Sequence, residues 1–441
     1  MKIRLHERKL IAVGCTFEEN DWGMYQFPKV YRMYDGALAA TLHVGEDSSR
    51  DYGRANPWFL SRDGGESWEA VKEDLSRFCG CALPDGTLLH AVVPPSINLD
   101  EAGITIPKDI VGHMLPSMDY PHPHKAQPGV MPTTLMCDTE FGLMKRAYYV
   151  DALPDGLYEK AYTMERFDPR TGETERFSAP LDWPYMTVTT LTYWDGKTFL
   201  PRPFPYGNLK VAPDGSLWVA TYGLGASPKT GGISRYDEAY VLRSTDEGRS
   251  FRLHSRVPYI PNIDVDPLAY IREGFNEPEI EFMPDGSVIM LMRTCGVGHG
   301  GPNFGPLYFT RSTDGGVSWD TPKPFDRYGV LPQMCHLACG VTLAVYGRPG
   351  IFVRATSDPS GLLWEAPVEI MTPADRTPLG NAPYNPQQTP FHAWEGSCCN
   401  MGLAVLDERR AIISYSDFYT PCEDGVKRKA CFTQVVEIEE L

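Results

Sequence analysis

Three segments of this chain repeat one pattern, in which serine, aspartate, glycine and serine precede an aromatic residue. The copies are SRDGGESW (61–68), RSTDEGRSF (243–251) and RSTDGGVSWD (311–320). The aspartate of such a segment can accept hydrogen bonds from the N–H groups of a tight turn, and the glycine permits a left-handed step. A degenerate fourth copy, SDPSGLLW, lies at 357–364. We interpret the pattern as a turn that recurs in successive structural units and does no chemistry.

Asp-Gly steps between short apolar runs recur along the chain as well. They occur within 30–43, 79–93, 149–162, 191–200, 209–222 and 280–293. Asp-Gly flanked by apolar runs is a strong signal for a β-hairpin. Little helical periodicity is present, and 39 prolines and 41 glycines interrupt the chain. Recurring hairpins without helices between them predict an all-β repeat architecture such as a propeller.

The amino-acid composition limits the kinds of molecule that the protein can bind. The formal net charge is −16, which argues against nucleic acid because that partner requires a basic face. No apolar run approaches the roughly 20 residues of a membrane span, and the N-terminal residues do not resemble a signal peptide. Eleven cysteines without paired spacing are typical of reduced thiols, so we expect a cytoplasmic protein. A few arginines could still form a pocket for a small anionic substrate.

The repeated turn motif resembles the Asp box of the sialidase superfamily, whose members are six-bladed β-propellers. The resemblance implies a single propeller domain over 1–441, closed by the N-terminal strand RKLIAVG against the last blade. The blades would span 24–70, 76–165, 185–252, 275–320, 334–366 and 398–437. The proline-rich insertion around 94–133 interrupts the repeat, and we expect it to be a structureless loop over one mouth of the propeller.

The same resemblance implies a set of site residues. Sialidases use three arginines that bind a substrate carboxylate, an aspartic acid near the leaving group, and a tyrosine nucleophile activated by a glutamate. In GFNEPEIEFMPDGSVIMLMRT, Glu277 resembles that glutamate, with Glu279 as the alternative, and Arg293 resembles an arginine of the triad. Arg348 resembles the third arginine. The acid would be Asp51, or Asp47 as the runner-up.

Two positions depart from the family pattern. Gln26 stands where the first arginine is expected, and Lys29 or Arg32 would have to replace its charge. Asn400 stands where the nucleophilic tyrosine is expected, and an amide is no nucleophile. Either another tyrosine reaches the site, Tyr384 or Tyr415, or the mechanism differs.

The departures favour an exo-acting glycoside hydrolase on a small acidic glycan, inverting, with Asp51 as general acid and Glu277 as base. Arg293, Arg348, Gln26, Lys29 and Asn400 would contact the substrate. His122 and His124 in the insertion could contact it as well. The two departures from the family pattern also leave open a lyase on uronate sugars, in which a histidine or tyrosine removes the proton α to the carboxylate. A non-catalytic glycan-binding propeller is the third alternative. We expect no metal and no cofactor, and the sequence indicates no oligomeric state.

Overall fold

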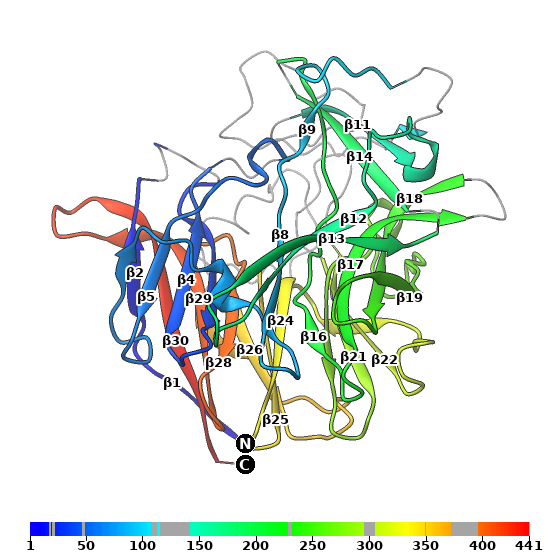
Figure 1. Ribbon diagram of the computed structural model, residues 1–441. Helices are drawn as coiled ribbons and strands as arrows, with labels where there is room; N and C mark the ends of the chain where they lie inside the picture. Colours follow the sequence, from blue (N-terminus) through cyan, green and yellow to red (C-terminus); the bar gives the residue numbers. More distant parts are fainter. Residues whose placement is uncertain are drawn as a thin grey trace.

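The computed structural model describes residues 1–16, 19, 23–45, 49–106, 113–114, 142–184, 186–193, 195–227, 232–294, 305–348, 350–371 and 396–440. Within these residues the chain is all-β, as predicted, and the helical segments are four short 3-10 turns. Antiparallel sheets stand side by side around a common centre (Figure 1). No helix among the described residues is long and apolar enough to cross a membrane.

Three sheets contain four consecutive antiparallel strands each, in the order in which the chain makes them. Their strands are β3 (Gln26–Arg32), β4 (Leu38–His43), β5 (Trp58–Ser61) and β6 (Glu69–Val71); β20 (Asn276–Phe282), β21 (Val288–Arg293), β22 (Leu307–Ser312) and β23 (Lys323–Asp326); and β24 (Val330–Leu337), β25 (Val341–Gly347), β26 (Ile351–Thr356) and β27 (Val368–Met371). Each sheet overlaps a predicted blade, 24–70, 275–320 or 334–366, and Asp-Gly turns connect β3 with β4 and β20 with β21.

A larger sheet of eight strands consists of two such groups. Its strands are β7 (Cys81–Ala82), β8 (Leu88–Val92), β12 (Ala161–Phe167), β13 (Thr174–Asp182), β16 (Lys210–Val211), β17 (Leu217–Ser227), β18 (Gly232–Ser244) and β19 (Phe251–Val257). A short parallel pairing of β13 with β19 joins the two groups. The predicted third blade, 185–252, is wrong at its start, because the second group begins at Lys210.

The N-terminal strands close the last sheet. Strands β1 (Lys2–Leu5) and β2 (Lys9–Val13) both pair with β30 (Lys427–Glu440), which continues through β29 (Arg410–Pro421) to β28 (Gly402–Val405). The two ends of the chain therefore lie together at one end of the molecule (Figure 1). The predicted closure by the N-terminal strand is confirmed.

A further sheet stands at the end of the molecule opposite the termini (Figure 1). It contains β9 (Ile97–Asn98), β10 (His113–Met114), β11 (Gly142–Tyr149), β14 (Thr187–Tyr193) and β15 (Thr198–Leu200). The insertion is thus not structureless in its described parts, since it supplies β9 and β10. The predicted hairpin at 149–162 is also wrong: a 3-10 turn, η3 (Val150–Ala152), follows β11, and β12 belongs to another sheet.

The repeated serine–aspartate motif forms the turn between the third and fourth strands of its sheets. The Asp63 carboxylate accepts hydrogen bonds from the Ser61 hydroxyl (2.8 Å) and the Ser67 N–H (3.0 Å). These bonds to the charged form lower the pKa of Asp63 to about 2. The aromatic residue reaches the preceding sheet, as Trp68 Nε1 donates to Thr433 Oγ1 at 3.0 Å. The motif therefore has the structural role that the sequence predicts, and it also joins neighbouring sheets.

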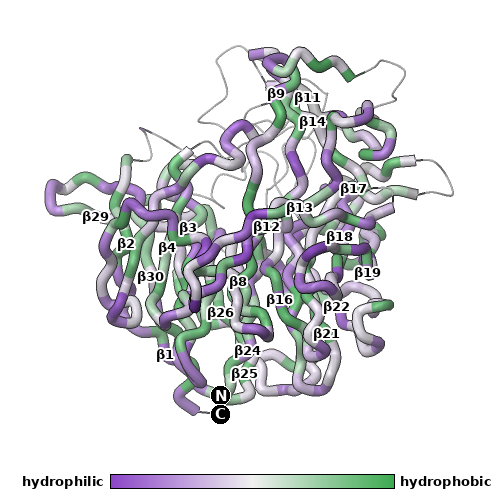
Figure 2. Tube along the Cα trace, viewed as in Figure 1, coloured by the Kyte–Doolittle hydropathy of each residue, from purple (hydrophilic) through white to green (hydrophobic). Residues whose placement is uncertain are grey.

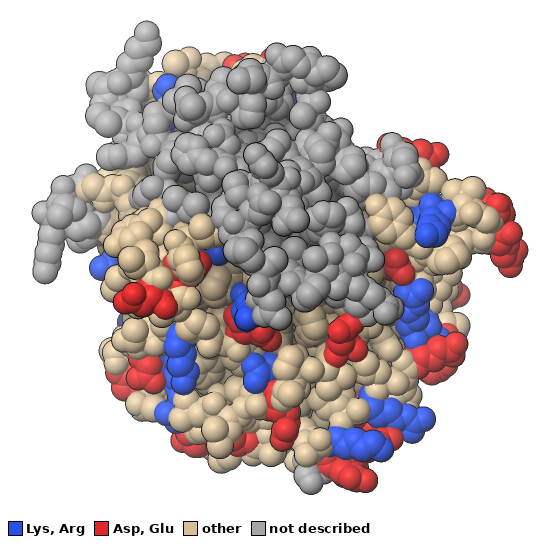
Figure 3. Space-filling model, turned by 180° about the vertical axis from the view of Figure 1, so that it is seen from behind, with Lys and Arg blue, Asp and Glu red and all other residues tan. Residues whose placement is uncertain are grey.

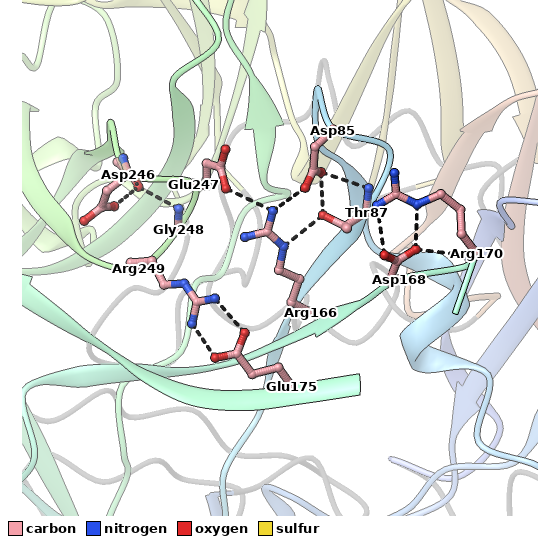
Figure 4. Close-up of polar contacts among 11 residues, drawn as sticks. Asp85, Thr87, Arg166, Asp168, Arg170, Glu175, Asp246, Glu247, Gly248 and Arg249 are labelled. Atoms are coloured by element: carbon pink, nitrogen blue, oxygen red, sulfur yellow. Dashed lines mark hydrogen bonds and ion pairs between the residues drawn. The ribbon is translucent and has the colours of Figure 1, made fainter. Parts of the chain in front are cut away.

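Ion pairs join the two groups of the eight-stranded sheet on their outer surface (Figure 4). The Arg166 guanidinium donates to Asp85 (2.6 Å) in the β7–β8 hairpin and to Glu247 (2.9 Å) in the turn before β19. Nearby, Arg249 forms a two-toothed pair with Glu175, both contacts being 2.6 Å. On the face seen in Figure 3, acidic and basic side chains likewise lie beside one another.

Apolar side chains pack between the sheets, and hydrophobic stretches of the chain trace occur along many of the strands (Figure 2). One such layer packs Val345 and Val353 against Ile413 and Val436, so it joins the β24–β27 sheet to the last sheet. The nine cysteines in the described part of the chain are free thiols. Burial between rigid sheets fixes the starts of the inner strands β3, β20 and β24, which carry the predicted site.

Candidate functional site

The inner strands of three sheets begin with the same strained bulge. Phe27, Glu277 and Leu331 have φ angles of 51°, 46° and 37°, and each precedes a proline. In each case the pairing with the next strand shifts register across these two residues. A non-glycine residue with positive φ costs about 1–3 kcal/mol, and such strain gathers at functional sites. A bulge of this kind changes the direction of the side chains on its strand.

Glu277 is held at this mouth by two partners. Its Oε1 accepts a 2.5 Å hydrogen bond from Arg293 Nη1, and its Oε2 accepts one from the Leu331 N–H at 2.8 Å. The Arg293 and Glu277 side chains are only 12% and 10% exposed. The structure thus places the two residues together, as the strand–turn–strand spacing predicts. Each carboxylate oxygen keeps a second lone pair that can accept a proton or a water molecule.

Arg348 and Asn400 also meet at the mouth. Arg348 Nη2 donates to the Cys398 carbonyl at 2.8 Å and to Asn400 Oδ1 at 3.2 Å. Arg348 has a φ of 68° and is buried. Arg348 therefore fixes the segment before β28.

Gln26 lies at the start of β3 and is completely buried. Its Oε1 accepts a 2.6 Å hydrogen bond from the Gly23 N–H, and its Nε2 has no partner among the described residues. The next residue, Phe27, donates its N–H toward the Cys398 sulfur at 3.5 Å. Gln26 thus borders the segment that Arg348 holds, although its amide cannot supply the charge of an arginine.

Lys29 follows the same bulge and lies within electrostatic range of Glu279, Glu277 and Cys398. Desolvation lowers the pKa of its amine, and the two glutamates oppose that effect only in part. Its Nζ forms no recorded hydrogen bond or ion pair with another described residue. Arg32, the alternative cation, is exposed at the opposite end of β3, where it pairs with Leu38. Of the two proposed substitutes for the missing arginine, only Lys29 stands at the mouth.

Glu279, the alternative to Glu277, is buried in polar contacts that hold neighbouring sheets together. Its carboxylate contacts Asn208 Nδ2 (3.1 Å) and Lys210 Nζ (3.2 Å), and the residue is 1% exposed. Burial raises the pKa of Glu279 despite the neighbouring lysine. Lys210 also contacts Glu281 at 2.6 Å and the Met334 carbonyl at 3.0 Å, so this ion-pair group connects three sheets at their inner strands.

Asp51 lies in the connection between β4 and β5 of the β3–β6 sheet. It ends a 3-10 turn, η1 (Ser49–Asp51), and its carboxylate lies 3.3 Å from Arg54 Nη1. The Ser49 hydroxyl contacts the Tyr193 hydroxyl at 2.7 Å, and Ser96 donates to the Ser49 carbonyl at 2.7 Å. The sheet of the inserted segment therefore fastens the turn that presents Asp51.

Two tyrosines beside Glu277 were not predicted from the sequence. Tyr206 precedes β16 and Tyr222 lies in β17, and their rings are 4.5 Å apart. Burial raises the pKa of both hydroxyls well above the ordinary value, and the Glu277 charge contributes to this shift. A methyl group added at Gly207 would lie 3.1 Å from the Pro278 carbonyl, which shows how closely this segment packs behind Glu277. The available signal was a tyrosine immediately after the apolar run of β17.

Other predicted positions do not reach the site or cannot be placed. Tyr415 is 2% exposed and donates to Gln434 Oε1 at 3.0 Å inside the last sheet, so the idea that it replaces the missing tyrosine is wrong. Asp47, His122, His124 and Tyr384 lie outside the described residues. Within the described part of the chain, no group of three or more acidic, histidine or cysteine side chains could hold a metal ion.

The assembled mouth combines carboxylates, cations and phenols. Asp51 and Glu277 come from different sheets; Arg293 contacts Glu277, and Lys29 lies within electrostatic range of it. Such a set can bind an anion and transfer protons on two sides of a bound molecule.

No protein-family model and no curated protein matches the chain. A solved protein of unknown function from Dyadobacter fermentans DSM 18053 is similar over 99% of this chain and 99% of its own, with 15% identity and a TM-score of 0.53. The NanB sialidase of Streptococcus pneumoniae matches 99% of this chain and 71% of its own, with 13% identity and a TM-score of 0.45.

The α-L-arabinofuranosidase Arb93A of Fusarium graminearum matches 97% of each chain, with 11% identity and a TM-score of 0.45. This chain therefore shares its fold with the Dyadobacter protein, and the solved structures that it matches at low identity include sialidases, the superfamily that its sequence resembles.

Proposed function

We propose that this protein is a glycoside hydrolase that removes a terminal sugar from a small acidic glycan. The proposal includes a six-bladed propeller, in which the eight-stranded sheet counts as two blades, β7–β8–β12–β13 and β16–β19. One observation carries it: the turn with Asp51 and the bulge with Glu277 are connected by the same tyrosines. Tyr52, next to Asp51, interacts with Tyr206 and Tyr222, and both of these interact with Glu277.

The proposed roles follow from the surroundings of each group. Asp51, from the half-exposed loop, donates a proton to the leaving oxygen. Glu277, fixed by Arg293 and the Leu331 N–H, accepts a proton from the attacking water. Lys29, Arg293 and Arg348 provide the positive charge for a sugar carboxylate. Asn400 takes the place of the tyrosine nucleophile and is held by Arg348, which favours direct attack by water and inversion at the anomeric carbon.

Time-resolved proton NMR of the purified protein tests this proposal, with sialosides and uronate-terminated disaccharides as substrates. Inversion predicts that the first product anomer is opposite to that of the substrate. A first anomer that matches the substrate would show that a side chain forms a covalent intermediate. A vinylic proton would instead identify a lyase, and the hydrolase proposal would then be abandoned. Binding without any product would identify a glycan-binding protein.

The space around Asp51 gives a sharper test of its role. A methyl group at Gly45 would lie 2.2 Å from Asp51 Oδ2 and 2.8 Å from Arg54 Nη1. Gly45→Ala must therefore push the Asp51 carboxylate aside, and we expect kcat/KM to fall by about 10²-fold, as for other displaced catalytic groups. Steady-state kinetics measure the loss, and the thermal unfolding midpoint should remain unchanged.

Gly223→Ala is the matched control, because the nearest atom to its new methyl group is Thr187 Oγ1 at an ordinary 3.7 Å. Equal activity of Gly45→Ala and the unaltered protein would remove Asp51 from the proposed mechanism.

A further inference from the structure

Four aromatic side chains form a continuous row from the Asp51 turn to Glu277. The ring centroids of Tyr52 and Phe204 are 5.2 Å apart, those of Phe204 and Tyr206 are 5.0 Å apart, and those of Tyr206 and Tyr222 are 4.5 Å apart. The rings come from three parts of the chain: the loop after β4, the segment before β16, and β17 itself. We call this row the aromatic wall.

The aromatic wall is not ordinary core. Tyr206 is 39% exposed, and Tyr52, Phe204 and Tyr222 are each partly exposed. Tyr162, by contrast, packs inside the core and is 1% exposed. Solvent reaches the Tyr206 ring while the surrounding protein crowds its hydroxyl enough to raise the pKa. Burial keeps the pKa of the Tyr206 and Tyr222 hydroxyls well above the ordinary value, so both phenols remain neutral and offer donors and acceptors without adding charge.

We propose that the aromatic wall binds the leaving-group sugar of the substrate, an inference that rests on the proposed hydrolase function. A sugar ring presents a face of C–H groups that packs on aromatic rings, and its hydroxyls bond to neighbouring polar groups. The wall starts at Tyr52, the residue after Asp51, and Asp51 protonates the leaving oxygen. The sugar attached to that oxygen therefore lies along Tyr52, Phe204 and Tyr206.

The close packing of the wall holds it in a defined position. Gly207 has no side chain because its backbone lies against the carbonyls of Ala220 and Pro278, at 2.7 and 3.1 Å from the site of an added methyl group. The Gly207 N–H also donates to the Ala220 carbonyl at 3.0 Å. Tyr206 is thus fixed to the strand that carries Tyr222 and to the bulge that carries Glu277. A rigid platform of this kind binds a ring without a large cost in conformational entropy.

Binding of sugar pairs tests the inference directly. Calorimetric titration compares sialyllactose with free sialic acid, and a uronate-terminated disaccharide with the free uronic acid, using the catalytically inactive Glu277→Gln protein. We expect at least one disaccharide to bind about tenfold more tightly than its terminal monosaccharide, equivalent to about 1.4 kcal/mol. Tyr206→Ala in the same background should abolish that difference and leave the monosaccharide affinity within about twofold.

Tyr270→Ala is the control, because Tyr270 is a tyrosine that is more exposed than Tyr206, at 58%, and lies in a different element, the 3-10 turn η4 (Ala269–Ile271); it should change neither affinity. Equal affinity of both members of every pair, or an equal loss of both on Tyr206→Ala, would overturn the aromatic wall as a leaving-group site. Absence of binding by all four sugars would overturn it as well. A Tyr206-dependent preference for the disaccharide, in a protein that releases no product on NMR, would uphold the site and overturn the hydrolase function alone.

Discussion

Replacing Glu277 by glutamine is expected to lower kcat by about 10²–10⁴-fold, the usual contribution of a positioned acid or base. The amide keeps the size of the side chain and can still accept a bond from Arg293 or from the Leu331 N–H. It cannot accept a proton from water. Substrate affinity should change little, because the loss concerns the transition state and not the bound substrate. Steady-state kinetics on the substrate identified by NMR measure both quantities.

Glu279→Gln is the matched control, since it alters a buried carboxylate two residues further along the same strand. Glu279 is engaged by Asn208 and Lys210 and is 1% exposed, so we expect its loss to change kcat by only a few fold. A larger effect of Glu279→Gln than of Glu277→Gln would exchange the roles of the two glutamates.

The largest effect on stability is expected for Lys210→Met. Lys210 Nζ is the cation that contacts Glu279 at 3.2 Å and Glu281 at 2.6 Å. Its removal leaves two carboxylates of β20 at the centre without that cation. Breaking a buried ion pair in this way typically costs about 3–5 kcal/mol in the free energy of unfolding. Urea denaturation at pH 7.5 measures the loss, provided that the transition remains two-state.

The same variant should show a characteristic pH dependence. Burial raises the pKa of Glu279 above its ordinary value, so the folded protein retains this proton at a higher pH than the unfolded chain. A group of this kind favours folding when protonated, and it costs stability as the pH rises above the unfolded pKa of about 4.3. Lys210→Met removes the compensating charge, so its destabilisation should be smaller at pH 5 than at pH 7.5.

Lys160→Met is the control for Lys210→Met, because Lys160 pairs with Asp151 at the surface, at 3.1 Å, with the carboxylate 64% exposed. Such pairs contribute about 0–1 kcal/mol. If Lys210→Met lowered the free energy of unfolding no more than Lys160→Met does, the central ion pairs would not stabilise the ring.

Features that depend on neighbouring residues in the chain were predictable from the sequence. The Asp-Gly steps form hairpins because aspartate and glycine act within a single turn, and Asp63 organises its own turn in the same way. The pairing of Glu277 with Arg293 was also within reach, since a hairpin of known length connects the two residues. Which sheet a hairpin joins depends on strands that lie far away in the sequence. The Trp-Asp-Gly hairpin of β14 and β15 was therefore assigned to a blade, although it pairs with β9 and β11.

The aromatic wall shows what local patterns miss at the site itself. Tyr206 and Tyr222 lie only 16 residues apart, around the hairpin of β16 and β17, but Tyr52 comes from another sheet. The proximity of Tyr52 to Tyr206 depends on how the β3–β6 sheet and the β16–β19 group face one another. The close approach of Gly207 to the Pro278 carbonyl, which settles the position of Tyr206, is a contact between sheets. The bulges at Phe27, Glu277 and Leu331 left a visible trace, a proline after each residue. One chain alone does not reveal that this proline marks a positive φ.

The pairing of β2 with β30 imposes an order on the making of this protein. Lys9 lies opposite Thr433, so β2 leaves the ribosome more than 400 residues before its partner β30 does. At ordinary rates of synthesis the delay is on the order of tens of seconds. During this interval Leu10 and Val13 belong to an unpaired strand edge, which invites association with other nascent chains. The first sheets can form as they emerge, but the ring as a whole is completed only once β30 has left the ribosome.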